Sequence, residues 1–519
     1  MVDPSIPLTS ADMKLHVLLA FLAACIGCGG PSAGAPYTAR AVAPPATQPV
    51  SPIASSVAPA TAPSAAPALP SSPAPPATFD VAAIDDYIAR QTATRGFVGL
   101  SVAIVKDGAI VLDKGYGQSQ LAPDVQAERD TSFLIGSITK QLVASLVLLL
   151  ADEKKLSPAD KVARYFPDLT RARDITLYDL MTHVSGYHDD YPLDFVDQEM
   201  KKPITADESI ALYAKRPLDF EPRTRFSYSS TGYKILGRVI EKVTGKPLGV
   251  VLEERILRPL GMTHSFYMPK AGAPGLASGY TSFALGPPEP AEPEGQGWHY
   301  GSSGLWAPAG DIARWGIALM SGKVLAPEAY KLFGTPRRLA DGRMTTYGCG
   351  IGTSTSRGGD AILSHGGGDA GFRGAELLVP RTRSAVVVLS NRDDADPWAL
   401  VTDIANLLDK EHRPPPLTIA GPPAEDVARE LFAAMQSGQV DRSRLGEEFN
   451  VFLTDAKLHG ASARLRSLGA PTDVRVEGAH ERGGMEAVTV HFTFATMKVD
   501  AVMYRSVDGK VQQFLISKL

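Results

Sequence analysis

The sequence is poor in cysteine and has no excess of charge of either sign. Three cysteines in 519 residues cannot form a framework of disulfide bonds. The 52 basic and 56 acidic residues give a formal net charge of −4, which argues against a surface that binds nucleic acid. Neither a His-x-His-x-Asp nor a His-Glu-x-x-His motif occurs, so we expect no metal centre, and we also expect no cofactor.

The chain also lacks an apolar run long enough to span a bilayer. Residues 14–24 contain one lysine followed by about ten mostly apolar residues, the length of the hydrophobic region of a signal peptide. The sequence Leu22-Ala23-Ala24-Cys25 resembles the bacterial lipobox, in which cleavage before the cysteine leaves a thiol that carries lipid. We therefore predict a lipoprotein signal peptide and lipobox in residues 1–28; a plain secretory signal is the alternative. Translation could start at Met1 or at Met13, which gives the more typical Met-Lys opening.

Proline-rich segments divide the rest of the chain. Residues 29–77 are mostly Pro, Ala, Ser and Thr with a single charge, Arg40, and cannot bury enough apolar surface to fold. A second proline-rich stretch covers residues 413–423. We therefore predict a disordered tether at 29–77, a large folded domain at 78–412, a linker at 413–423 and a small accessory domain at 424–519. With the lipobox, this organisation predicts an exported protein of the bacterial cell envelope whose membrane partner is reached through a lipid anchor.

Apolar periodicity predicts strands at both ends of the larger domain and helices between them. Residues 97–116 form two β-branched runs around Asp107-Gly108, which is a strong hairpin signal. Residues 137–322 have mainly helical spacing. Further strands are predicted at 347–352, 361–364, 375–379 and 385–390, before an amphipathic helix through Trp398 and Leu408. The fold class is thus α/β (α+β), with one antiparallel sheet built from both ends of the domain.

Residues 424–519, the tail of the chain, are predicted to form a second, smaller α+β unit. A helix follows Ala424, and strands are predicted at 487–494, 498–505 and 511–516. This order is similar to that of the cone-shaped nuclear-transport-factor-like fold. We find no group of residues in the tail that carries chemistry.

The segment Ser137-Ile138-Thr139-Lys140 is the predicted centre of the chemistry. A long apolar helical run follows Lys140, so the serine and the lysine would share one face of the first helical turn. A serine hydroxyl becomes a good nucleophile when a neighbouring base takes its proton, and a lysine can do this only if its pKa is lowered. The spacing alone is weak evidence, because it also occurs by chance.

Several motifs in one order strengthen this interpretation. They are F-L-I-G-S-I-T-K at 133–140, I-T-L-Y-D-L-M-T-H-V-S-G-Y at 175–187, F-E-P-R-T-R-F-S-Y-S-S-T-G-Y at 220–233, R-P-L-G-M at 258–262 and S-H-G-G-G at 364–368. Together they resemble the serine β-lactamase-like superfamily, which contains class C β-lactamases, D-amino-acid peptidases and related esterases. The resemblance covers about residues 80–412 and is specific for the fold but much less so for the substrate.

The resemblance implies a role for each matching residue. Ser137 would be the acylated nucleophile, Lys140 its proton acceptor, and Tyr228 the phenol that passes protons to the leaving group. The backbone N–H groups of Ser137 and Gly368 would form the oxyanion hole. The remaining matches, which would bind substrate, are Ser230, His365, Gly366 and Gly367.

Two departures from the superfamily pattern bear on the substrate. Ser230 stands where many relatives have an asparagine, so the carboxamide that grips a substrate amide is missing. His365 replaces a lysine and can be neutral near pH 7, which weakens binding of a substrate carboxylate. We therefore expect an acyl-enzyme hydrolase acting on a D-amino-acid peptide, such as a cell-wall peptide, or on a small ester. The alternatives are a non-catalytic or very slow penicillin- or peptide-binding lipoprotein and, next, a class C-like β-lactamase.

Three other residues invite interpretation and are assigned no catalytic role. His183 and Ser185 could suggest a second catalytic pair, but the corresponding segment of the resembling superfamily is structural. Cys349, in a predicted strand flanked by glycines, is expected to be a small buried residue.

Overall fold

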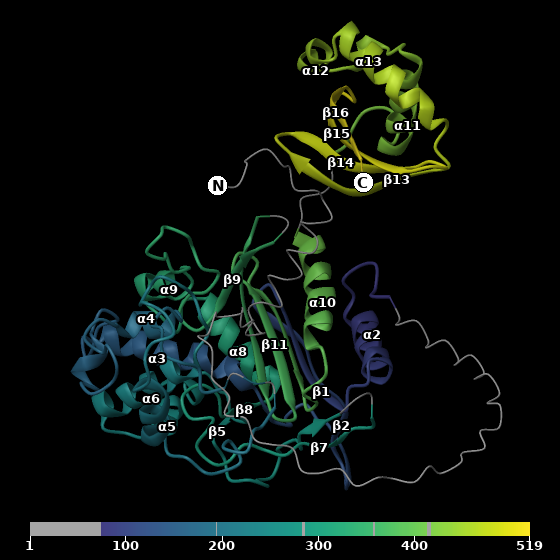
Figure 1. The fold of residues 1–519 in the computed structure, drawn as a ribbon. Coiled ribbons are helices and arrows are strands. Elements are labelled where there is room, and N and C mark those ends of the chain that lie inside the picture. The colour runs from purple at the N-terminus through teal and green to yellow at the C-terminus, as the bar shows by residue number, and fades with distance from the viewer. Residues whose placement is uncertain are drawn as a thin grey trace, which may run out of the picture. The chain divides into compact units, whose positions relative to one another are not determined.

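The computed structural model describes residues 74–518, apart from 192, 194, 283–285, 357–358 and 413–416. The chain divides into two compact units at the boundary between His412 and Arg413, and each unit is described here by itself (Figure 1). The predicted signal peptide, the lipobox with Cys25 and most of the predicted tether lie outside the described residues. Within the described residues, no helix combines the length and the apolar character that crossing a membrane requires.

The larger unit is built on one seven-stranded antiparallel sheet in the order β3-β2-β1-β12-β11-β10-β9. The central contact joins the two ends of the unit, because β1 pairs with β12 from Leu100↔Ser390 to Val105↔Ala385. The predicted sheet from both chain ends is therefore confirmed. The strands are β1 (Gly99–Lys106), β2 (Ala109–Leu121), β3 (Asp124–Gln126), β9 (Gly352–Thr355), β10 (Ala361–Asp369), β11 (Phe372–Val379) and β12 (Ser384–Ser390).

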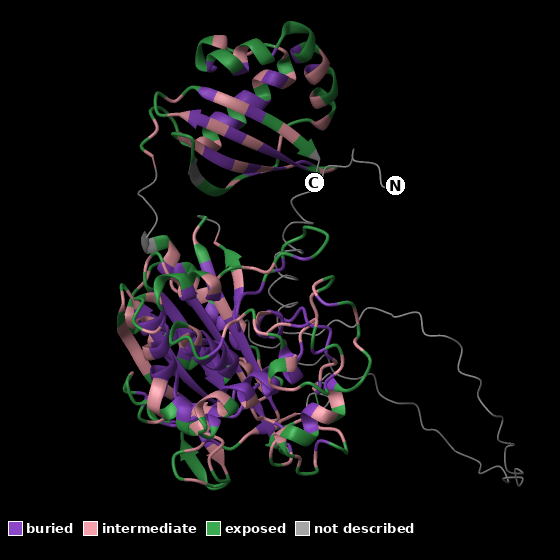
Figure 2. Ribbon diagram, turned by 90° about the vertical axis from the view of Figure 1, so that its left-hand side faces the viewer, coloured by how far each residue is buried: buried purple, intermediate pink, exposed green. Residues whose placement is uncertain are grey.

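Helices bury both faces of this sheet. On one face, Val102 and Val388 pack in a cluster with residues of α2 (Val81–Thr94) and α10 (Pro397–His412). On the other face, Ala103 and Val387 pack with residues of α3 (Thr139–Asp152) and α8 (Ala309–Met320). The central strands are consequently buried along their whole length (Figure 2). This double burial explains why their sequences are continuous apolar runs rather than alternating patterns.

The region between the two groups of strands is mainly helical, as predicted. Helix α3 runs through its centre and is buried on nearly all sides, which fits its uniformly apolar sequence. Short strands connect the helices: β4 (Phe133–Leu134), β5 (Phe266–Tyr267) and β8 (Leu305–Ala307) form one sheet, and β6 (Tyr280–Thr281) pairs with β7 (Glu289–Pro290). The other helices are α4 (Leu177–Met181), α5 (Ala206–Ala214), α6 (Ser230–Thr244), α7 (Leu248–Leu252), a π-helical turn (Glu253–Leu257) and α9 (Pro327–Phe333).

Two expectations for the larger unit need correction. The strand predicted at 347–352 is a loop, and strand β9 begins only at Gly352. Gly350 has φ +78°, and a Cβ on Gly348 would lie 2.2 Å from the carbonyl oxygen of Phe333, so these glycines serve a tight turn and not a strand. Cys349 is fully buried, as expected, but it lies in this loop. The sequence interpretation also missed helix α2.

The smaller unit packs three helices on a four-stranded antiparallel sheet. The sheet order is β13-β14-β15-β16, and its core contains Phe432 of α11, which contacts Phe492 of β14 with ring centroids 4.6 Å apart. The predicted strands correspond to β14, β15 and β16, but β13 was not predicted. The elements are α11 (Ala424–Ser437), α12 (Glu447–Phe452), α13 (Asp455–Leu465), β13 (Asp473–Arg482), β14 (Met485–Thr493), β15 (Lys498–Ser506) and β16 (Val511–Lys518).

Candidate active site

Ser137 and Lys140 meet at the start of the central helix α3. Gly136 has φ +59° and opens a 3₁₀ turn, Gly136–Ile138, that leads directly into α3. The spacing predicted Ser137 in the first turn of the α-helix. It lies instead in this tighter turn, just before α3. The Nζ of Lys140 lies 2.9 Å from Ser137 Oγ and 2.9 Å from the carbonyl oxygen of Ser302. The carbonyl contact fixes the amine beside the hydroxyl.

Burial of the Lys140 side chain favours its neutral amine, the form that can act as a base. The side chain is 1% exposed, and loss of hydration lowers its pKa to about 8. Three carboxylates, of Asp189, Asp369 and Asp190, act in the opposite direction and keep the pKa of Lys140 from falling further. At pH 7 about one amine in ten is then neutral and able to accept a proton from Ser137.

Tyr228 lies over the same amine, on the loop that precedes α6. Lys140 Nζ is 4.9 Å from the centroid of its ring. The imidazole of His183 supports the other side, with the two ring centroids 4.2 Å apart. The Nδ1 of His183 accepts a hydrogen bond from the backbone N–H of Ser229 at 3.1 Å, and burial lowers the pKa of His183 well below its usual value. A neutral, buried His183 thus holds the Tyr228 loop, which agrees with the structural role expected for this segment.

Strand β10 lies with its backbone directly against the serine turn. A Cβ on Gly367 would stand 2.0 Å from the carbonyl oxygen of Ile135, and a Cβ on Gly136 would stand 2.5 Å from the backbone nitrogen of Gly368. Only glycine permits this approach. The neighbouring Gly366 pairs with Ala375 within the sheet. The structure therefore brings the predicted Gly366–Gly368 stretch next to Ser137.

His365 is present beside these glycines, but its two ring nitrogens are already engaged. Nδ1 lies 2.6 Å from the carbonyl oxygen of Gly366, which can only accept, so Nδ1 carries the proton. Nε2 then accepts a hydrogen bond from the hydroxyl of Tyr347 at 2.7 Å. Burial lowers the pKa of His365 to about 4, so the ring is neutral at pH 7. The sequence analysis missed Tyr347, for which the glycine-rich loop around Cys349 was the only signal.

Ser230 begins α6 and lies at the edge of the site. It is 7% exposed, and its backbone N–H donates to Asp189 Oδ1 at 2.7 Å. The next carboxylate, Asp190, forms a fully buried ion pair with Lys234. Neither aspartate was predicted, because the segment that contains them has no recognisable motif.

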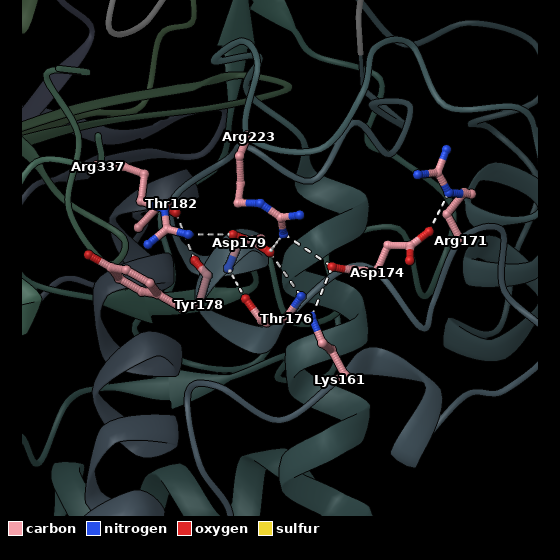
Figure 3. A network of polar contacts seen from close by, with 9 residues as sticks. All are labelled: Lys161, Arg171, Asp174, Thr176, Tyr178, Asp179, Thr182, Arg223 and Arg337. Atoms are coloured by element: carbon pink, nitrogen blue, oxygen red, sulfur yellow. Dashed lines mark hydrogen bonds and ion pairs between the residues drawn. The ribbon is translucent and has the colours of Figure 1, made fainter. Parts of the chain in front are cut away.

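A buried carboxylate, that of Asp179, holds the loops that carry Tyr228 and Tyr347 through two arginines. Figure 3 shows this carboxylate with its contacts to Arg223 and Arg337. Asp179 of α4 is completely buried and accepts from Arg223 at 2.8 Å and from Arg337 at 2.7 Å. The backbone of Arg223 donates to the carbonyl oxygen of Val184, and that of Arg337 donates to the carbonyl oxygen of Tyr347. Asp179 therefore links α4 to both loops without contacting the serine.

A further charged cluster includes the last residue of β10. Within the described residues, Glu294, His299 and Asp369 bring one ligand atom each to within 4.8 Å of one another. His299 Nε2 lies 3.2 Å from Glu294 Oε2 and 3.7 Å from Asp369 Oδ1. These residue types can hold a cation, and the sequence gave no sign of them because they come from separate loops and a strand end.

The chain was compared with known proteins. It is 31% identical over 257 residues to PbpX of Bacillus subtilis, described as a penicillin-binding protein; the match covers 49% of this chain and 62% of PbpX. It is 25% identical over 401 residues to a D-aminopeptidase of Gluconobacter oxydans, covering 75% of this chain and 73% of that protein. The chain spans less than two thirds of PbpX and about half the length of several other curated relatives.

A comparison with solved structures and a family model are consistent with these sequence matches. The octameric penicillin-binding protein homologue of Pyrococcus abyssi superposes with a TM-score of 0.57 at 22% identity, covering 85% of this chain and 100% of that one, which shows the same fold. The family model described as Beta-lactamase matches residues 84–408, more than half of the chain. The chain therefore belongs to the beta-lactamase family.

Proposed function

We propose that the protein is an exported serine hydrolase that forms an acyl-enzyme at Ser137 on an amide or ester substrate. The observation that carries this proposal is the contact between a buried lysine amine, with its pKa lowered to about 8, and the serine hydroxyl 2.9 Å away. Such a pair supplies both a nucleophile and the base that activates it. In this proposal residues 78–412 form the hydrolase domain and residues 424–519 an accessory domain.

The reaction proceeds in two steps at one carbonyl carbon. The neutral amine of Lys140 takes the Ser137 proton while the serine oxygen attacks, and the backbone N–H groups of Ser137 and Gly368 bind the resulting oxyanion. Tyr228 passes a proton to the leaving amine or alkoxide, so the C–N or C–O bond breaks and an ester to Ser137 remains. A water molecule, deprotonated through the same groups, then releases the acid and restores the serine.

The substrate we favour is a D-amino-acid peptide, including cell-wall peptide, or a small ester. Two features support this choice over a β-lactam. Ser230 provides no carboxamide, and neutral His365 provides no cation for the carboxylate that penicillins and cephalosporins carry. The D-aminopeptidase of Gluconobacter oxydans, similar over 75% of this chain, points to the same class.

Steady-state turnover of three probes tests the proposal: p-nitrophenyl acetate, a D-Ala-D-Ala peptide and a chromogenic cephalosporin. We expect Ser137→Ala to abolish every measurable turnover. The matched control is Ser185→Ala, because Ser185 is 3% exposed, accepts from the Tyr187 N–H at 3.3 Å and should leave turnover within about twofold. Activity that survives Ser137→Ala refutes the nucleophile. A stoichiometric adduct at Ser137 without turnover identifies a binding protein instead.

Export with a lipid on Cys25 is the part of the proposal that rests on sequence alone. Growth of an expressing bacterium with labelled palmitate should label the wild-type protein and place it in the membrane fraction. Cys25→Ser should lose both properties, whereas Cys28→Ser, three residues away, should keep them. Secretion of an unlabelled, cleaved wild-type protein contradicts lipidation and supports a plain signal peptide.

A further inference from the structure

The cluster of Glu294, His299 and Asp369 lies at the wall of the proposed active site. Asp369 follows Gly368 directly on β10 and accepts from Ser303 Oγ at 2.5 Å. The neighbouring Ser302 is the residue whose carbonyl oxygen holds Lys140. The charges of Asp369 and Lys140 also shift each other's pKa values. One short segment, 302–303, thus connects the cluster to the catalytic amine.

The side chain of Asp369 faces the serine turn. Successive residues of a strand point to opposite faces, so Asp369 shares a face with Gly367 and His365. The Cβ position of Gly367 points at the backbone of Ile135 and Gly136, immediately before Ser137. Asp369 therefore extends the row of residues that borders the nucleophile.

Asp369 Oδ1 accepts no hydrogen bond from the residues that the structure describes. Its side chain is only 5% exposed; Oδ2 accepts from Ser303, while the nearest cation to Oδ1 is His299 Nε2 at 3.7 Å, beyond hydrogen-bond range. Glu294, by contrast, accepts from Tyr191 Oη at 2.5 Å and from the backbone of Ala370 at 3.1 Å, and it takes the closer contact with His299. Two carboxylates share one imidazole, so the cluster has one negative charge in excess when His299 is protonated.

The pKa values agree with this charge balance. The two neighbouring carboxylates raise the pKa of His299 to about 9 despite its burial, so the ring carries a proton at pH 7. Burial raises the pKa of Asp369 to about 6, which reflects a carboxylate that is short of compensating charge. A cation that reached Oδ1 would remove this penalty.

Among the described residues near Ser137, the imidazole of His365 and two cationic side chains already contact other protein groups. Both nitrogens of neutral His365 are engaged with Tyr347 and Gly366. Lys234 is paired with Asp190, and Arg373, beside Gly368, donates from Nε to the carbonyl oxygen of Asp393 at 2.6 Å. Asp369 Oδ1, in contrast, is left as an acceptor for a positively charged group.

We propose that Asp369, supported by Glu294 and His299, is the subsite for the free ammonium group of the substrate. The inference rests on the function proposed above and narrows it to amides or esters of an amino acid with a free α-amine. It predicts that the enzyme cleaves the bond that follows an amino-terminal residue with a free amine. It also predicts slow cleavage of substrates that must be recognised through a terminal carboxylate. The ammonium would donate to Asp369 Oδ1, the oxygen without a hydrogen bond.

Two rival interpretations make different predictions. Asp189 is a second carboxylate near Lys140. It already accepts hydrogen bonds from the backbone N–H groups of Ser230, at the start of α6, and of Tyr191, so its role is structural. A divalent metal could also bind Glu294, His299 and Asp369. It would have to displace the proton of His299, whose raised pKa makes that displacement unfavourable near neutral pH.

The test compares two substrates that differ in one group: D-alanine p-nitroanilide and D-lactic acid p-nitroanilide, in which a hydroxyl replaces the ammonium. We expect the wild-type kcat/KM to be at least about tenfold higher for the D-alanine compound, the value of a charged hydrogen bond. Asp369→Asn should remove this preference, mainly by raising KM for D-alanine p-nitroanilide. The kcat/KM values of both substrates depend on the pKa of Lys140 in the free enzyme, so their ratio does not change when the substitution shifts that pKa.

Asp189→Asn is the matched control, since it removes a carboxylate that also acts on Lys140. It should change both kcat/KM values by the same factor. A ratio that stays at the wild-type value in Asp369→Asn refutes the ammonium subsite. A ratio that collapses after dialysis against EDTA, with zinc found by mass spectrometry, also refutes it in favour of a metal.

Hydrolysis of p-nitrophenyl acetate separates this inference from the proposed function. If Ser137→Ala abolishes acetate hydrolysis while the wild type shows no preference for D-alanine p-nitroanilide, the nucleophile stands and the ammonium subsite fails. If Ser137→Ala leaves acetate hydrolysis intact, the proposed function itself fails.

Discussion

Replacement of Asp179 by asparagine should destabilise the larger unit and inactivate it, although Asp179 does not touch the serine. The carboxylate accepts from Arg337 on Oδ1 and from Arg223 on Oδ2, and Oδ2 also accepts from the Thr176 N–H at 3.0 Å (Figure 3). Asparagine retains one oxygen of the two. Its NH₂ group must then face a donor, whichever way the amide is oriented.

The size of the effect follows from these contacts. A hydrogen bond to a charged group contributes about 1.5–3 kcal/mol, and removal of one partner of a buried ion pair costs about 3–5 kcal/mol. The side chains of Arg223 and Arg337 are 39% and 21% exposed, so water compensates for part of the loss. We therefore expect Asp179→Asn to lower the free energy of unfolding by about 3 kcal/mol, which for a unit of this size is equivalent to a Tm lower by about 4 °C.

Calorimetry of the larger unit's unfolding transition, together with kcat/KM for p-nitrophenyl acetate at 25 °C, measures both effects. Asp174→Asn is the control, because its carboxylate is 46% exposed and pairs with the exposed side chain of Arg171. The contact that Asp174 makes with Arg223 uses its backbone carbonyl oxygen, which the substitution keeps. This control should change stability by less than about 0.5 kcal/mol. A Tm of Asp179→Asn within about 1 °C of the wild-type value would refute the assigned role of the network.

Three further outcomes are expected. The kcat/KM for p-nitrophenyl acetate should rise about tenfold per pH unit below pH 7 and level off above pH 9. The reason is that Lys140, with a pKa of about 8, must be neutral to accept the proton. A kcat/KM that does not change with pH contradicts this. Gly367→Ala should lower kcat/KM at least about a hundredfold by pushing β10 away from Ile135, whereas Gly334→Ala, whose Cβ would have its nearest neighbour at 3.6 Å, should not. Tyr347→Phe removes the donor that stabilises neutral His365, so the pKa of His365 should rise above about 4 in NMR titrations; an unchanged value contradicts the assigned hydrogen bond.

The fold could be predicted where local chemistry and burial agree. Asp107 and Gly108 adopt φ of +54° and +83°, the positive values that an Asp-Gly hairpin turn requires, so this turn and its two strands were found. Strand β13 was missed because it is rich in charged residues and only Val474 of its first residues is buried. The shift of β9 arises from the turn at Gly348 and Gly350, which depends on contacts with Phe333 and Lys140 that are remote in sequence.

The residues of the site also differ in whether they could be predicted from the sequence. Residues within ordered motifs, Ser137, Lys140, Tyr228 and His365, were identified from sequence, and the structure brings them together. The groups that set their properties were not, because Tyr347, Asp189 and the Glu294–His299–Asp369 cluster reach the site from loops without a recognisable pattern. A motif specifies which atoms react, whereas the charge around them depends on tertiary contacts.

The charge around Lys140 illustrates why those unrecognised groups matter. Burial alone favours the neutral amine, yet the carboxylates of Asp189, Asp369 and Asp190 favour the ammonium, and the pKa of about 8 is the balance of the two. A substrate ammonium bound at Asp369 would neutralise one of these carboxylates and place a positive charge near Lys140. This one added positive charge offsets the carboxylate and lowers the pKa of Lys140, so the correct substrate would increase the fraction of neutral base. The same contact would then serve recognition and activation, and the pH profile of kcat, which reports the enzyme–substrate complex, should lie at lower pH for D-alanine p-nitroanilide than for the D-lactic acid compound.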